Sequence, residues 1–318
     1  MSAFEQTPAS KILVREWSRD SGAEFLLRAA VEPVSLASAP ALARAVVSEL
    51  VSTLVGHSAA ARLFQQGLKL SFDGHAQIAV PSLQGDAAYA AFVAEGKPMP
   101  VMQAALPPLA VLVPRKLAAI VVLTREMTQS SNLEALMLDA LQRSVGLALD
   151  KALLDDQPGD EARPAGIRCG IAALTASTAP EPGAALMQDI ETCRRAVAEV
   201  TPTHPIYVMS GTRALMAELR SQHGLKPLTV LGSLALKGTM IMLAITPENI
   251  ASVLDGPPEI IANQDAGLQM DDVPPDVFDA SAVRSTWQSD CVALQIKLPV
   301  TWAARSPAGV AWLTTTNW

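Results

Sequence analysis

The sequence contains few charged residues, few aromatic residues and few cysteines. Charged residues make up 17% and aromatic residues 4% of its 318 positions, whereas hydrophobic residues make up 50%. Its 3 cysteines, Cys169, Cys193 and Cys291, are far apart and form no CxxC pair. This spacing predicts neither a disulfide framework nor a zinc site, and we expect three buried, reduced thiols.

Residue types that carry catalysis or metal binding do not converge either. The 4 histidines lie far apart and outside ligand motifs such as HExxH: His57, His75, His204 and His223. In the segment 232–239 a lysine precedes the second glycine, which predicts a β-turn entering a strand and not a phosphate-binding loop. Ser210 lacks the first glycine of a nucleophile elbow and is predicted to cap a helix. We therefore predict no enzyme activity, no catalytic residue, no cofactor and no metal site.

No hydrophobic run is long enough to cross a bilayer, which takes about 18 residues or more. The strongest run, Leu117–Leu123, is bracketed by Arg115, Lys116 and Arg125. Because the mean hydropathy is nevertheless high, at +0.26, we expect the surplus apolar surface in a core or in contacts between copies of the chain. The net charge of −7 argues against a surface that binds nucleic acid throughout.

The sequence does contain a strand followed by one long amphipathic helix, within residues 114–155. Apolar residues recur at the i, i+3, i+4 spacing of one buried stripe: Leu133, Leu136, Met137, Ala140, Leu141, Val145, Ala148, Leu149, Ala152 and Leu153. Ser131 and Glu134 form a capping box at the start, and Asp150 falls mostly outside the stripe. We predict a helix over 132–154, roughly 35 Å long at 1.5 Å per residue, which suits a scaffold better than an active site.

Between residues 67 and 105 the pattern changes to short alternating strands. Apolar residues alternate over Leu68–Phe72, Asp73-Gly74 is a hairpin turn signal, and alternation resumes at Ile78–Val80. Since this hairpin has little core of its own, we expect it to project outward and to lie on a neighbouring molecule.

The pattern over residues 166–284 predicts a second α/β region. A helix is predicted over 184–200 and a buried strand over 206–209, and a further helix after Ser210 carries Leu215, Met216 and Leu219. Short strands are predicted over 238–244, 259–262 and 268–270.

The C-terminal segment returns to strict alternation. Every second residue from Val292 to Leu298 is apolar and is predicted to face one way. The predicted partner of this strand is Ala110–Leu123, on the far side of the second α/β region. Such a pairing makes the first domain discontinuous, with the second domain inserted into it.

Four segments, in this order, resemble the major capsid protein of tailed double-stranded DNA bacteriophages, the family with the Hong Kong 97 fold. They are Phe92–Pro100 (an "EG-x-x-x-P" segment), Pro114–Met127, Gly232–Ile241 followed by Pro247, and Val292–Ala311. The resemblance covers roughly residues 37–318.

The resemblance implies an α+β fold of the Hong Kong 97 type with a long spine helix over 132–154, an extended β-hairpin loop, and an axial domain inserted into a discontinuous peripheral domain. The implied segments are an N-terminal arm (1–36), a helical segment joining arm to core (37–66), the extended loop (67–105), the peripheral domain (106–165 and 285–318) and the axial domain (166–284).

The function implied by the resemblance is structural: hexamers and pentamers of one chain close an icosahedral shell around a double-stranded DNA genome. The chain would be part of the virion capsid and would be assembled in the host bacterial cytoplasm. Its implied partners are itself, packaged DNA bound without sequence specificity and, as in some family members, a scaffolding protein, a maturation protease, a portal and a cement protein. No membrane is implied.

Two alternatives stay open. An encapsulin-type nanocompartment shell of the same fold would enclose a cargo enzyme, and a metabolic α/β enzyme would need a convergent cluster of polar residues. For the shell function, the expected assembly contacts are charged residues within the extended loop and beside the strand before the spine helix: Glu95, Lys97, Arg115, Lys116, Arg125 and Glu126. The strand beside Arg115 and Lys116 is expected to be largely buried.

Overall fold

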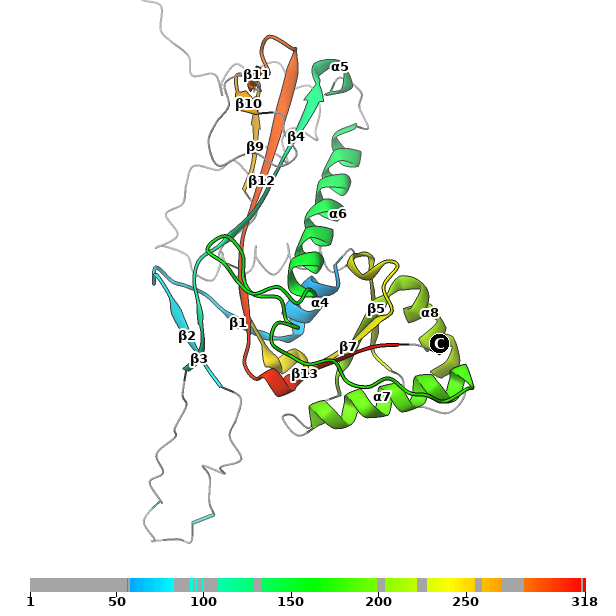
Figure 1. The fold of residues 1–318 in the computed structure, drawn as a ribbon. Helices are drawn as coiled ribbons and strands as arrows, with labels where there is room; N and C mark the ends of the chain where they lie inside the picture. The colour runs from blue at the N-terminus through cyan, green and yellow to red at the C-terminus, as the bar shows by residue number, and fades with distance from the viewer. Residues whose placement is uncertain are drawn as a thin grey trace, which may run out of the picture. The chain divides into compact units, whose positions relative to one another are not determined.

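The computed structural model describes residues 56, 58–82, 92–93, 95, 99, 108–128, 133–198, 204–221, 228–254, 259–269, 283–315 and 317–318. All of them belong to one unit that runs from Val47 to Trp318. This unit combines helices and strands (Figure 1), and the predicted α+β class is confirmed.

The described helices and strands have the following bounds. The helices are α4 (Ala59–Gln66), α5 (Arg125–Thr128), α6 (Leu133–Leu153), α7 (Pro182–Ala198) and α8 (Gly211–Ser221), with the 3-10 helices η2 (Leu234–Leu236), η3 (Pro247–Asn249) and η5 (Pro307–Gly309). The strands are β1 (Leu68–Leu70), β2 (Ile78–Pro81), β3 (Pro108–Leu112), β4 (Lys116–Thr124), β5 (Ile206–Ser210), β6 (Val230–Ser233), β7 (Ile241–Ile245), β8 (Ile250–Leu254), β9 (Glu259–Asn263), β10 (Gly267–Gln269), β11 (Val283–Ser285), β12 (Cys291–Ala304) and β13 (Val310–Thr314).

The long strand β12 organises the first sheet, whose described strands follow the order β1-β8-β12-β4. The first part of β12 pairs antiparallel with β4 on one side and with β9 on the other, and its last part pairs with β8. Figure 1 shows β12 in orange beside β4. The predicted pairing of the C-terminal strand with the strand before the spine helix is therefore confirmed over Lys116–Thr124.

Strand β4 is not largely buried, which corrects the prediction. Alternate residues, such as Leu117 and Val121, pack against the main core, whereas Ile120 between them is 50% exposed. Only Leu123 of this strand is buried. A continuous apolar run resembles a strand covered on both faces, but here the core covers one face only.

The second sheet has the described order β13-β7-β5-β6. Strand β5 is buried at every residue because both of its faces are covered. Tyr207 and Met209 pack into a cluster with α7 and α8, whereas Ile206 and Val208 belong to the main core together with α4 and α6. The predicted helix over 184–200 is observed as α7, and the predicted strand over 206–209 as β5.

Helix α8 faces the sheet with its small residues and not with its large ones. Ala214 and Ala217 are buried, whereas Leu215, Met216 and Leu219 are 59%, 49% and 57% exposed. The reason is a close approach of α8 to β6: a Cβ atom added at Gly232 would lie 3.0 Å from the Gly211 Cα. Such a short separation leaves room for alanine but not for leucine or methionine.

The predicted turn after Phe72 is present, but the hairpin that it was expected to join is not. Asp73 and Gly74 have φ values of 45° and 86°, and the His75 N–H donates to the Phe72 carbonyl at 2.8 Å. However, β1 pairs in parallel with β8, and β2 pairs antiparallel with β3. Residues of both strands, together with Phe72, pack in one small cluster with Ala251 and Val253 of β8. Most of the remaining predicted loop lies outside the described residues.

Strand pairing crosses the predicted segment boundaries in both directions. Strand β13, from the segment 285–318, pairs with β7 of the segment 166–284. Conversely, β8 and β9 of the segment 166–284 pair with β12. The five-segment division stays a prediction.

The predicted long helix is observed as α6, which has 21 residues. Its stripe residues Leu141, Val145, Leu149 and Leu153 are buried in the main core, together with residues of β5, β7 and β12. The predicted cap residue Ser131 lies outside the described residues.

We expect Leu141→Asp to lower the free energy of unfolding by at least about 3 kcal/mol, because it leaves a cavity and buries an unpaired carboxylate. Urea unfolding of dissociated subunits measures this loss. Ala140 is exposed, so its predicted place in the buried stripe is wrong. Ala140→Asp is therefore the matched control on the same helix, with an expected loss below about 1 kcal/mol, which is the difference in helix propensity. Equal losses in both variants would contradict the placement of the stripe.

Candidate functional site

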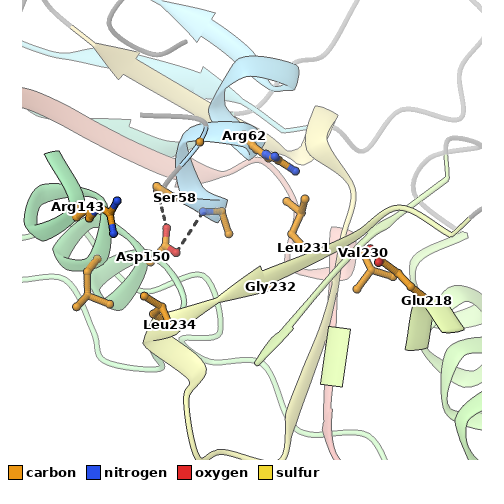
Figure 2. Close-up of a pocket in the computed structure, with 12 residues that line it drawn as sticks. Ser58, Arg62, Arg143, Asp150, Glu218, Val230, Leu231, Gly232 and Leu234 are labelled. Carbon is orange, nitrogen blue, oxygen red and sulfur yellow. Dashed lines mark hydrogen bonds between the residues drawn. The ribbon is translucent and has the colours of Figure 1, made fainter. Parts of the chain in front are cut away.

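A buried carboxylate on α6 is the most highly connected polar group in the described part of the chain. Asp150 is 2% exposed, so its predicted place outside the buried stripe is wrong. Its carboxylate accepts hydrogen bonds from the Ser58 hydroxyl at 2.6 Å, the Ser233 hydroxyl at 2.5 Å, and the backbone N–H groups of Ala59 and Ala60 at 3.2 and 2.9 Å. Figure 2 shows Asp150 between Ser58 and the strand that leads to Leu234.

These four donors come from the starts of two other helical segments. Ser58 caps α4 by accepting from the Ala61 N–H, and Ser233 caps η2 by accepting from the Ala235 N–H. Helix starts present unpaired N–H groups and a partial positive charge, which favour a carboxylate nearby. Burying Asp150 without such donors would cost several kcal/mol, so its contacts hold α4, α6 and η2 together.

A cavity of about 440 Å³ lies beside Asp150, and Arg62, Arg143 and Glu218 also line it (Figure 2). Arg143 forms an ion pair with Asp139 at 2.9 Å, one turn away on α6. Each oxygen of Asp150 already accepts two hydrogen bonds, so this carboxylate is in use as a structural acceptor and not poised as a general base. Within the described residues, no group of three or more His, Cys, Asp or Glu could hold a metal ion.

A second buried carboxylate, Asp189, ties the C-terminal residues to α7. Its oxygens accept from the Ser177 N–H at 2.6 Å and from the Trp318 indole N–H at 2.7 Å. The Arg213 guanidinium of α8 lies 5.0 Å above the Trp318 ring. Cation–π contacts of this kind add to the ordering of both groups, so the described end of the chain connects α7 with α8.

The predicted assembly residues do not form one site. Arg115 and Lys116 lie at the start of β4, whereas Arg125 and Glu126 lie beyond its end, at the start of α5. Glu95 is exposed in a turn, and Lys97 lies outside the described residues.

Arg115 is engaged within the chain. Its guanidinium donates to the Asp160 carbonyl at 2.5 Å, and its own carbonyl accepts from the Val300 N–H at 3.0 Å. The Arg163 N–H, which donates to the Asp160 carboxylate, holds the pKa of that group below its usual range. Arg115 therefore fixes the start of β4 against a loop of the same chain.

Arg125 and Glu126 are exposed at the other end of β4. The Arg125 guanidinium lies 3.7 Å from the Asp290 carboxylate, and its backbone N–H donates to the Asp290 carbonyl at 2.9 Å. This end of the β4–β12 pair therefore carries charges of both signs.

Sequence reasoning missed the large apolar side chains that the fold leaves in water. Beyond the three on α8, they include Trp287 at 77%, Leu234 at 70%, Val111 at 52%, Met240 at 51% and Ile120 at 50% exposure. Exposed apolar side chains can take part in association where they lie together on a surface. Leu215, Met216 and Leu219 have the spacing of core residues, so their periodicity does not identify them as exposed.

The cysteines are free, and Cys193 alone among them is buried, which corrects the expectation of three buried thiols. Burial, with the nearby Asp189 carboxylate as a smaller cause, raises the pKa of Cys193 to about 12. Cys169 and Cys291 are partly exposed. Among the described helices, none is long and apolar enough to cross a membrane.

Comparison with known proteins identifies the fold. No protein-family model matches the sequence, and no curated protein matches it. Solved structures do match, in 169 chains.

Among the matching structures is one from Microbacterium phage Oxtober96, with a TM-score of 0.57 at 13% identity, covering 82% of this chain and 91% of that one. A structure from Mycobacterium phage Bobi has a TM-score of 0.57 at 14% identity and covers 80% and 90%. The procapsid of satellite phage P4, including its size determination (Sid) protein, gives a TM-score of 0.51 at 9% identity, covering 93% and 98%. The chain thus shares a fold with proteins of phage structures, one of them a procapsid, and the resemblance to phage capsid proteins is confirmed at the level of the fold.

We expect Asp150→Asn to lower the free energy of unfolding by about 2–4 kcal/mol, because an amide nitrogen would face donors that the carboxylate now accepts from. The control is Asp139→Asn on the same helix, whose side chain is 43% exposed. Losing an exposed i,i+4 pair costs about 0.3–0.5 kcal/mol. Urea unfolding of both variants tests the difference, and a loss below 1 kcal/mol for Asp150→Asn would contradict the structural role of this carboxylate.

We expect a disulfide reagent at pH 8 to modify Cys169 and Cys291 in the native subunit and to modify Cys193 only after unfolding. The thiolate is the reacting species, and a pKa of about 12 leaves almost none of it at that pH. Mass spectrometry of the labelled peptides locates the modified residues, and Cys193→Ser should leave the fast phase unchanged. Rapid modification of Cys193 would contradict its burial.

Proposed function

We propose that the chain is the major capsid subunit of a tailed, double-stranded DNA phage. Copies of it would form the hexamers and pentamers of an icosahedral shell that encloses the genome. The observation that carries this proposal is the fold, which is shared over 80% or more of the chain with structures from phages, one of them a procapsid. The role is structural, and no catalytic step is assigned to the chain.

The internal architecture supports the role of a rigid structural subunit. Helix α6 packs into one core with strands of both sheets, and Asp150 ties this helix to α4 and η2. Close-packed interiors transmit strain instead of absorbing it. A subunit with one shared core and such a buried hydrogen-bond network would resist deformation by forces from neighbouring subunits.

We further propose the Hong Kong 97-like arrangement of domains. In it, α6 is the spine helix, the sheet around β12 belongs to the peripheral domain, and the sheet with α7 and α8 belongs to the axial domain. The pair β2–β3 would be the base of the extended loop over 67–105, and residues 1–36 and 37–66 would be the arm and its connection. Strand β13 joins the axial sheet by its pairing with β7.

The contacts between copies are also part of the proposal. Exposed charges at Glu95, Lys116, Arg125 and Glu126 would lie at contacts with neighbouring subunits, together with Lys97. Arg115 would act indirectly, because its hydrogen bond to the Asp160 carbonyl holds the start of β4 in place. A scaffolding protein, a maturation protease, a portal, a cement protein and packaged DNA are the remaining proposed partners, and assembly would take place in the host cytoplasm.

The test is the expression of the full chain in a bacterial host, followed by size-exclusion chromatography and negative-stain electron microscopy. We expect closed shells, capsomer rings or tubes. Leu141→Asp serves as the control for folding-dependent assembly and should yield none of them. A wild-type chain that remains a monomer or dimer at every concentration, with and without the products of neighbouring genes, would contradict the proposal.

The contents of native particles distinguish a capsid from an encapsulin-type compartment. Nuclease-protected double-stranded DNA is the expected cargo. A stoichiometric enzyme in place of DNA, detected by mass spectrometry, would assign the same shell to a nanocompartment.

A further inference from the structure

Trp287 is a large apolar side chain placed almost entirely in water. It lies in the turn between β11 and β12 and is 77% exposed, whereas Trp302 on β12 itself is 6% exposed. A tryptophan buries about 150–250 Å² when covered, more than almost any other side chain. A folded subunit that leaves such a residue outside forgoes a substantial hydrophobic gain.

The turn that carries Trp287 is held firmly by hydrogen bonds on both sides of it. Thr286 is fully buried, and its hydroxyl accepts from the Ala266 N–H at 2.9 Å and donates to the Gln264 carbonyl at 2.7 Å. The Cys291 N–H donates to the Thr286 carbonyl at 2.8 Å. The exposed indole is therefore presented on a fixed backbone, which lowers the entropy lost on binding.

The residues around this turn carry charges of both signs. Arg125 and Asp290 form their ion pair there with side chains that are 54% and 68% exposed. Glu126 and Arg284 are exposed at the same end of the β4–β12 pair. A rim with two cations and two carboxylates allows a second copy of the same surface to place opposite charges against each other, as contacts around a symmetry axis require.

We propose that Trp287 is an assembly anchor that packs against a second copy of this chain, with Arg125, Glu126, Arg284 and Asp290 as the charged rim of that contact. This inference rests on the proposed shell function and adds the residue at its centre. Interface energy concentrates in a few aromatic and arginine side chains surrounded by polar contacts that exclude water. Trp287 and its rim have this composition.

The test compares three variants of the full chain with the wild type: Trp287→Ala, Trp287→Phe and Gln288→Ala. Gln288 is the exposed neighbour in the same turn. We expect Trp287→Ala to raise the subunit concentration at which particles form by at least about tenfold, the effect of losing one hot-spot side chain. Trp287→Phe should retain most of the assembly and Gln288→Ala all of it, and equal melting temperatures of the dissociated subunits show that all three fold.

Hydroxyl-radical footprinting read by mass spectrometry then follows Trp287 itself. We expect oxidation of Trp287 to fall at least about fivefold between dissociated subunits and particles, with Trp302 as the internal reference that does not change. Particles in which Trp287 reacts as fast as in free subunits would overturn the anchor and leave the shell function standing. If Trp287 is protected only when a second protein species is present, that species and not a second copy of this chain is the partner, and the proposal is wrong. A wild-type chain that never assembles would overturn both proposals.

Discussion

A buried carboxylate needs hydrogen-bond donors for both of its oxygens, and this requirement determines how α4, α6 and η2 pack against one another. Asp150 satisfies it with hydroxyl and N–H groups from the starts of α4 and η2, 83 to 92 residues away in the sequence. All of these donors reach the carboxylate only when α4, α6 and η2 stand in one arrangement. The contact therefore specifies both the rotation of α6 about its axis and its position along the second sheet.

The apolar stripe of α6 extends this arrangement to the rest of the unit. Leu141, Val145, Leu149 and Leu153 lie in the same core as residues of β5, β7 and β12, so the helix links the two sheets. The second sheet is covered on its other face by α7 and α8. Asp189 of α7 accepts a hydrogen bond from the Trp318 indole N–H and so fixes the end of the chain against this layer. Buried carboxylates thus hold the layers at two places, and apolar packing fills the space between them.

The parts of the fold that the sequence predicted are those determined by local periodicity. The helix α6 and the strand β12 could be predicted, because a repeated apolar spacing shows itself within a few residues. The pairing of β12 with β4 was predicted from the apolar run of Leu117–Leu123, which needs a partner strand. The partners of Asp150 could not, since Ser58 and Ser233 come from distant segments and carry no shared motif. The exposed Leu215, Met216 and Leu219 have the spacing of core residues, and only the close approach of Gly211 to Gly232 shows why they face outward.

The same limit explains why two charges of the proposed contact were predicted from the sequence and its tryptophan was not. Arg125 and Glu126 stand beside a long apolar run, where a charge is conspicuous. The exposure of Trp287 depends on a turn that ends at Asp290 with a φ of 49°, a left-handed conformation that periodicity does not indicate. Since the hydrogen bonds of Thr286 form without the indole, we expect Trp287 to be dispensable for folding. Its exposure is a cost to the single subunit that burial in an assembly would offset.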